Sequence, residues 1–133
     1  MRPFDVLVVS HGDLASAMVA SAFMICGETP GVRAVSLVPT DSPETFAVRL
    51  LASIDDERPT LILSDLCGGT PGNVVLSVAR DRSGVRSICG ANLGLLMEAM
   101  TADGELDDAF VERLVTLARE GVKDVTSRVR PSG

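Results

Sequence analysis

A short apolar run and the polar turn after it, FDVLVVSHG at residues 4–12, decide the fold of this chain. Phe4–Val9 is almost continuously apolar and rich in β-branched residues, which is typical of a strand buried on both faces of a sheet. In the next segment, Leu14–Cys26, apolar residues recur every three or four positions, and Gly27 follows as a stop signal. This segment is therefore predicted to be a helix that buries Leu14, Met18, Ala22 and Ile25.

The same alternation of strand and helix continues along the chain. Strand-like runs lie at Val35–Val38, Thr60–Leu63 and Val85–Cys89, and helical patterns run from Asp41 or Ser42 to Ile54 and over residues 70–82, 92–100 and 106–120. Parallel strands need such crossover helices. We therefore expect an α/β fold with a flavodoxin-like doubly wound sheet, whose four parallel strands follow the order 2-1-3-4. Val122–Val129 loosely alternates apolar and polar residues and predicts an additional edge strand.

The composition fits a single acidic domain over residues 1–133. Hydrophobic residues make up 46% of the chain and aromatic residues 3%, and the net charge is −6. The negative charge and the lack of Trp and Tyr argue against nucleic acid or an anionic membrane as a partner. No apolar run reaches the ~20 residues of a membrane helix, and the N-terminus lacks the apolar stretch of a signal peptide. We expect a cytoplasmic protein that does not insert into the membrane directly.

The three cysteines, Cys26, Cys67 and Cys89, are widely spaced and odd in number. Without a C-x-x-C motif they predict neither a disulfide framework nor a zinc site. Cys26 and Cys89 lie in apolar contexts and are expected to be small core residues. The chain has one histidine, which excludes sites that need two, so we expect no metal centre.

Two polar loops should meet at one crevice. In the strand order 2-1-3-4 the topological switch lies between strands 1 and 3, and ligands bind at the carboxyl ends of those strands. Residues 10–12 (SHG) follow the first strand, and residues 64–71 (SDLCGGTP) follow the third. His11 is therefore expected to lie near Asp65.

These residue types suit phosphoryl transfer through histidine. A carboxylate such as Asp65 can hold one imidazole nitrogen of His11 and leave the other as a nucleophile. The glycines at 68–69 let the backbone approach a bulky anion, and the free backbone amides of the helix that starts at Thr70-Pro71 can bind that anion. The helix start after Gly12 supplies a second set of amides to the same place.

Less specific interpretations stay open from these residues alone. A single histidine at a strand end can serve as a structural hydrogen-bonding residue, and an aspartate before Gly-Gly can form a turn or cap a helix. A serine hydrolase is disfavoured, because the chain has no G-x-S-x-G motif and Ser10 points away from His11 on an extended chain.

The segments around His11 and Asp65 resemble the mannose-type enzyme IIA domain of the bacterial phosphoenolpyruvate-dependent sugar phosphotransferase system. The matching residues are Val8-Val9-Ser10-His11-Gly12 with Leu14-Ala15, Asp65-Leu66-Cys67-Gly68-Gly69-Thr70-Pro71 with Asn73, and Gly90-Ala91-Asn92-Leu93 with Leu96 and Glu98. The resemblance covers essentially the whole chain. The sequence departs from the family pattern at Cys67, where the family often has an aromatic residue, and at Gly94, where it usually has proline.

What the resemblance implies is a phosphoryl relay, with a phosphohistidine as its intermediate. His11 would accept the phosphoryl group from the histidine-containing phosphocarrier protein, on Nε2, while Asp65 binds Nδ1. The phosphate-binding residues would be Gly12, Gly68, Gly69 and Thr70. The group would pass to a IIB protein, expected to be a separate chain because this one ends at Gly133, and then to a sugar entering through a membrane permease complex. No metal or organic cofactor is implied.

The family fold also has a C-terminal antiparallel strand that is exchanged between the subunits of a homodimer. Val122–Val129 is the candidate for that strand. Partners are expected to dock on apolar residues around the crevice, for which the candidates are Leu14, Met18, Leu66, Leu96 and Met97. Three alternatives remain: a regulatory IIA protein without a permease, the phosphocarrier domain of a dihydroxyacetone kinase, and a non-catalytic binding module.

Overall fold

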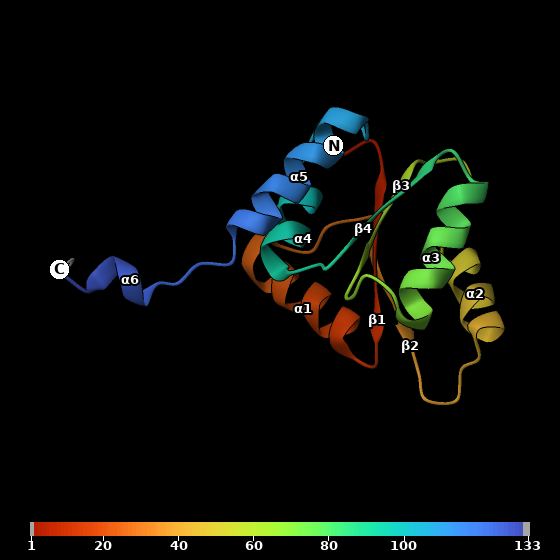
Figure 1. Cartoon of the computed structure of the whole chain (residues 1–133). Coiled ribbons are helices and arrows are strands. Elements are labelled where there is room, and N and C mark those ends of the chain that lie inside the picture. Colours follow the sequence, from red (N-terminus) through yellow and green to blue (C-terminus); the bar gives the residue numbers. More distant parts are fainter. Residues whose placement is uncertain (1, 132–133) are drawn as a thin grey trace.

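The computed structural model describes residues 2–131 and has an α/β fold, in which helices cover both faces of a parallel sheet (Figure 1). The strands are β1 (Asp5–His11), β2 (Val32–Leu37), β3 (Thr60–Ser64) and β4 (Val85–Cys89), and the helices are α1 (Leu14–Cys26), α2 (Pro43–Ala52), α3 (Gly69–Asp81), α4 (Leu93–Met100), α5 (Asp108–Glu120) and α6 (Thr126–Val129). The strands pair in the order β2-β1-β3-β4, which confirms the expected order. Of the expected single domain over residues 1–133, Met1, Ser132 and Gly133 lie outside the described residues.

Alternate residues of the central strands enter two separate apolar layers. Val6 and Val8 of β1 pack in a cluster with α1, α4 and α5, whereas Leu7 and Val9 pack with α2 and α3. Figure 1 shows these two groups of helices on opposite faces of the sheet. Because both faces are covered, β1 needs apolar residues at successive positions, which explains its continuous apolar run. Within residues 2–131, no helix is both long and apolar enough to span a membrane.

Helix α1 has the predicted bounds, but its buried face is only partly the predicted one. Ala22 is buried and Met18 packs against the core as predicted, whereas Leu14 and Ile25 are 49% and 56% exposed. Ala15 and Val19 face the sheet instead. The prediction was wrong for Leu14 and Ile25 because the helix is apolar around most of its circumference, so the spacing of its apolar residues does not single out one stripe. Small residues on the packed side let the helix approach the sheet closely.

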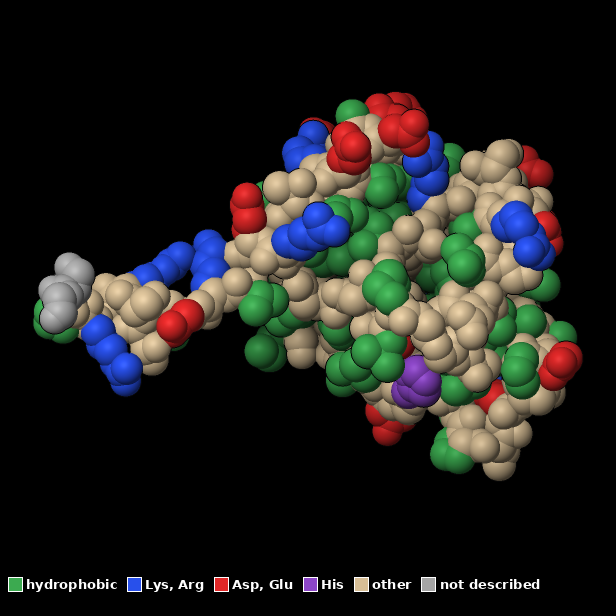
Figure 2. Space-filling model, in the orientation of Figure 1, with side chains coloured by type: hydrophobic (Ala, Val, Ile, Leu, Met, Phe, Trp, Pro, Cys, Tyr) green, Lys and Arg blue, Asp and Glu red, His purple; other side chains and the backbone are tan. Residues whose placement is uncertain are grey.

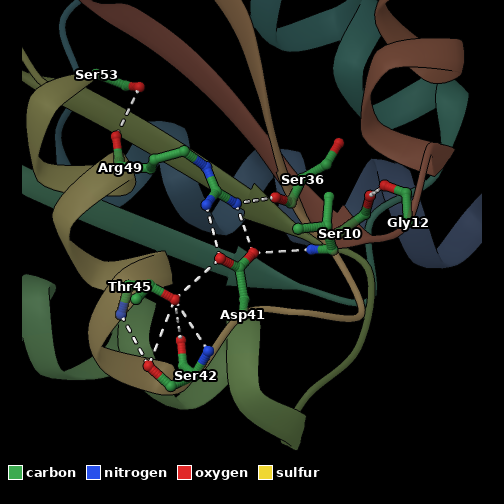
Figure 3. Close-up of polar contacts among 9 residues, drawn as sticks. Ser10, Gly12, Ser36, Asp41, Ser42, Thr45, Arg49 and Ser53 are labelled. Carbon is green, nitrogen blue, oxygen red and sulfur yellow. Dashed lines mark hydrogen bonds and ion pairs between the residues drawn. The ribbon is translucent and has the colours of Figure 1, made fainter.

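The loop between β2 and α2 is held by an ion pair (Figure 3). Ser42 is the N-cap of α2 and forms a capping box with Thr45, so Asp41 is free for another role. Arg49 donates from both terminal nitrogens to the Asp41 carboxylate, at 2.7 Å each, and also to the backbone carbonyl of Ser36. The hydrogen bonds from Arg49, with that from the Val38 amide, hold the pKa of Asp41 well below its usual range. The loop is thereby fixed beside the end of β2.

The C-terminal segment differs from the expected edge strand. Residues 122–125 are irregular, and 126–129 form the short helix α6, which projects away from the body of the molecule (Figure 1). The local cause is Asp124, whose carboxylate accepts hydrogen bonds from the backbone amide and the hydroxyl of Thr126 and so favours a turn. In this single chain residues 122–129 therefore do not form the expected strand.

The cysteines also depart from the prediction. Cys67 and Cys89 form a disulfide with their Cα atoms 4.9 Å apart, and both residues are exposed. Cys26 is a free thiol and is exposed at the end of α1. Neither Cys26 nor Cys89 lies in the core, because each comes at the last position of its helix or strand, where the chain leaves the packed layer.

Candidate functional site

His11 is the last residue of β1, and the turn that follows it depends on Ser10. The Ser10 side chain is buried inside this turn, where its hydroxyl accepts a hydrogen bond from the Ala15 amide at 2.7 Å and donates to the Gly12 carbonyl at 3.2 Å. The Gly12 amide in turn donates to the Leu37 carbonyl of β2 at 2.8 Å, and Gly12 adopts a left-handed φ of +56°. Figure 3 shows Ser10 bonded to Gly12 beside Ser36. These contacts fix the backbone that carries the imidazole.

Sequence reasoning missed this role of Ser10. The residue takes the place of a side-chain cap for α1, since the Asp13 carboxylate makes no capping hydrogen bond to that helix. A hydroxyl residue shortly before a predicted helix was the available signal. The buried, doubly bonded hydroxyl makes this serine structural.

Asp65 holds the imidazole from the neighbouring loop. Its Oδ2 lies 2.9 Å from Nδ1 of His11 and accepts the His11 backbone amide at 3.0 Å, while its Oδ1 accepts the Leu66 amide at 2.9 Å. Partial burial alone would raise the pKa of Asp65, but the hydrogen bonds from the His11 ring, the His11 amide and the Leu66 amide outweigh it and lower that pKa. An ionised carboxylate only accepts hydrogen bonds, so in the neutral imidazole Nδ1 carries the proton and Nε2 keeps its lone pair.

The exposed edge of the imidazole faces the start of α3. A Cβ atom added to Gly69 would lie 3.2 Å from Cε1 and 3.4 Å from Nε2 of His11, so the backbone of Gly69 runs directly beside the ring. The N-cap of α3 is Gly68, which has no side chain to occupy the first amides of the helix. These amides and the helix dipole favour an anion next to Nε2.

The structure thus brings together His11 and Asp65, which the sequence placed at the strand ends, and Gly69, which the sequence predicted near the anion. The other predicted phosphate-binding residues, Gly12, Gly68 and Thr70, are neighbours of these residues in the sequence. Within the described residues 2–131, they form no hydrogen bond with the imidazole. The His11 side chain remains 46% exposed. The arrangement offers one oriented nucleophilic nitrogen and an anion-binding helix end at an open surface.

The surface around the imidazole is partly apolar (Figure 2). Leu14 and Leu66 are 49% and 58% exposed. Leu96 is buried in the core, and Met18 and Met97 are half-buried and pack against the core. The apolar rim is therefore narrower than the sequence predicted, because α4 turns Leu96 inward.

We expect Ser10→Ala to destabilise the chain. Loss of the hydroxyl leaves the buried Ala15 amide and the Gly12 carbonyl without this partner, which costs about 1–2 kcal/mol in free energy of unfolding. Urea denaturation followed by circular dichroism measures the change. Ser16→Ala, at an exposed position of the same helix, is the matched control and should be neutral or slightly stabilising. Equal stability of the two variants would contradict the capping role.

The sequence is similar to IIA components of the phosphotransferase system (PTS). Residues 5–118 match the family described as "PTS system fructose IIA component". The chain is 31% identical over 130 residues to the PTS system mannose-specific EIIAB component of Escherichia coli, with 92% of this chain covered but 40% of that protein. It is 35% identical over 114 residues to the PTS system sorbose-specific EIIA component of Klebsiella pneumoniae, with 84% of each chain covered.

A solved structure is similar over nearly its whole length. The mannose/sorbose-specific IIA subunit of the phosphotransferase system from Enterococcus faecalis superimposes with a TM-score of 0.86 and is 31% identical, with 93% of this chain and 95% of that chain covered. The similarity therefore includes the sheet and both helix layers that position His11 and Asp65.

Proposed function

Because the chain belongs to the family of PTS fructose-type IIA components, we propose that it carries phosphoryl groups in a sugar phosphotransferase system, with His11 as the phosphoacceptor. The observation that supports this most strongly is the contact of 2.9 Å between Nδ1 of His11 and Asp65, which leaves Nε2 directed at the start of α3. The curated relative from Escherichia coli is longer, since the chain spans 40% of it.

The chemistry follows from the charges at the site. The Nε2 lone pair attacks the phosphorus of a phosphohistidine on the donor protein, and a P–N bond forms at His11 as the donor's P–N bond breaks. The Nδ1 proton stays on the ring, and the Asp65 carboxylate stabilises the positive charge that develops there. The amides at the start of α3 bind the phosphoryl oxygens beside Gly69. Transfer to the next protein runs the same steps in reverse.

The proposed donor is the histidine-containing phosphocarrier protein, and the proposed acceptor is a IIB protein that phosphorylates a sugar. Both have to reach Nε2 from solvent, which the 46% exposure of His11 allows. Leu14 and Leu66 border the site and supply apolar docking area. We place this relay in the cytoplasm, where a membrane permease complex would meet the IIB partner.

Incubation with phosphoenolpyruvate, enzyme I and the phosphocarrier, followed by intact mass, tests the proposal. One added phosphoryl group is expected, and its absence would reduce the chain to a binding module. Capture of a IIB protein by the phosphorylated chain would separate sugar transport from a regulatory IIA role, and transfer to a dihydroxyacetone kinase would favour that alternative.

The close approach of Gly69 to the imidazole predicts a sensitive position. We expect Gly69→Ala to slow phosphoryl transfer, because the new Cβ would press on the ring in addition to straining a φ of +72°. Gly27→Ala is the matched control, since its φ is +89° but its Cβ would meet open space, and Gly27 lies beyond the far end of α1. Both variants should lose about 1–2 kcal/mol in free energy of unfolding, but Gly69→Ala alone should show the marked loss of transfer rate. Equal transfer rates would contradict a role for the contact with His11.

We further propose a homodimer in which residues 122–129 of each chain form an antiparallel strand on the partner's sheet. Three valines of this segment, Val122, Val125 and Val129, are 64–82% exposed, and β4 is an edge of the sheet as described. A groove of about 560 Å³ lies along β4 and is lined by Ile88, Val111 and Val115, among others. Pairing there would cover the edge amides together with Val125 and Val129, which share one face of the strand.

Light scattering at micromolar concentration tests the dimer. We expect the full chain to be dimeric and a double change, Val125→Asp with Val129→Asp, to yield monomers. Val48→Asp, which adds a charge at a valine 68% exposed on α2, is the matched control and should leave the dimer intact. A full-length chain that is monomeric under these conditions would rule the exchange out.

A further inference from the structure

The disulfide between Cys67 and Cys89 joins the loop beside the imidazole to the end of the outer strand. Cys67 lies midway between Asp65, which holds Nδ1 of His11, and Gly69, which borders Nε2. Cys89 is the last residue of β4 and pairs in register with Ser64 of β3. The disulfide therefore links residues 65–69 to the edge strand β4, while the hydrogen bond of Asp65 links the same residues to the imidazole at the end of β1.

The position of the pair suits reversible oxidation. Both cysteines are exposed in the single chain, where they line the end of the groove along β4. Their Cα atoms are 4.9 Å apart, within the range that a disulfide spans without backbone movement. The two apolar layers on either side of the sheet contain neither sulfur, so the core does not depend on the bond. In the cytoplasm, where the proposed relay operates, disulfides are usually transient or redox-sensing.

We propose that Cys67 and Cys89 form a thiol–disulfide switch that slows phosphoryl transfer at His11 when it is oxidised. This inference rests on the proposed function. A phosphoryl group on Nε2 has to fit against Gly69, whose backbone runs beside the ring, so residues 65–69 have to adjust to make room for it. The disulfide holds Cys67 against β4 and so restrains this adjustment of residues 65–69, whereas two free thiols leave it possible.

Glutathione disulfide can serve as the two-electron oxidant that forms the Cys67–Cys89 bond. A thiolate of the pair attacks glutathione disulfide and forms a mixed disulfide, with one glutathione thiolate as the leaving group. The second protein thiolate then attacks the mixed disulfide, forms the Cys67–Cys89 bond and releases the second glutathione. The two cysteines are oxidised and one glutathione disulfide is reduced to two thiols.

The test compares the reduced and oxidised full-length chain, prepared with dithiothreitol or glutathione disulfide and freed of reagent before the relay proteins are added. Alkylation followed by mass spectrometry counts free thiols and gives a readout that does not depend on activity. We expect three alkylated cysteines in the reduced chain and Cys26 alone in the oxidised chain. We expect the oxidised chain to accept phosphate about tenfold more slowly.

Cysteine variants distinguish the effect of the Cys67–Cys89 disulfide on the transfer rate from other effects of glutathione disulfide. Cys89→Ser should accept phosphate at the rate of the reduced chain under both conditions, and Cys67→Ser serves as a second variant with the same expectation. Cys26→Ser is the matched control and should keep the full response, because Cys26 lies at the far end of α1, about 18 Å along the helix from its start near His11.

Three results would overturn the switch: equal rates for the two forms, failure of Cys67 and Cys89 to pair under glutathione disulfide, or a response that persists in Cys89→Ser. If neither form accepts phosphate, the proposed function fails and the switch fails with it. Normal and equal phosphorylation of both forms would overturn the switch alone.

Discussion

A His11→Ala variant will accept no phosphoryl group from the phosphocarrier, whereas the unaltered chain will accept one. His11 is the chain's single imidazole, so no second histidine can replace its Nε2 as the nucleophile. The fold should survive, because the His11 side chain is 46% exposed and lies outside both apolar layers. Intact mass after incubation with the relay proteins measures the loss.

Two controls accompany this measurement. Ser16→Ala should accept phosphate fully, and circular dichroism should show that His11→Ala keeps its secondary structure. The modification on the unaltered chain should be stable in alkali and lost in acid, as a phosphohistidine is. Stoichiometric labelling of His11→Ala would contradict the assignment of the phosphoacceptor.

Asp65→Asn should slow phosphoryl acceptance by about 10–100-fold, as is typical when the partner that orients a histidine is changed. The asparagine amide has nearly the same shape, but it can present its NH₂ group to Nδ1 and carries no charge to stabilise the phosphorylated ring. The lowered pKa of Asp65 means that the native residue is a carboxylate at neutral pH. Rapid-quench measurement of the first turnover separates this effect from that of partner binding.

The matched control for Asp65→Asn is Asp13→Asn. Asp13 is an exposed carboxylate two residues after His11 and makes no capping hydrogen bond to α1. Its replacement removes the same charge near the site without touching the contact with Nδ1. An equal slowing in both variants would attribute the effect to net charge and reduce Asp65 to a turn residue.

The sequence by itself determined the features that follow from local pattern and chain chirality. The continuous apolar run of β1, the crossover helices and the strand order are of this kind, since parallel strands joined by right-handed crossovers leave few arrangements. From that order alone, His11 and Asp65 had to follow adjacent strands at one edge of the sheet. The left-handed turns at Gly68 and Gly69 likewise depend on residue type, because glycine adopts positive φ without steric cost.

Tertiary structure alone decided which residues meet across the chain. The packed face of α1 depends on how the helix sits on the sheet, because its apolar residues surround most of the axis. The pairing of Cys67 with Cys89 needs the end of β4 to lie beside the loop after β3, which a separation of 22 residues does not reveal. At the C-terminus the alternating pattern predicted a strand, but a strand needs a partner edge, and in the single chain the hydrogen bonds of Asp124 with Thr126 form a turn instead. In each case the conformation depends on whether residues far apart in sequence come into contact. Local periodicity does not encode such contacts.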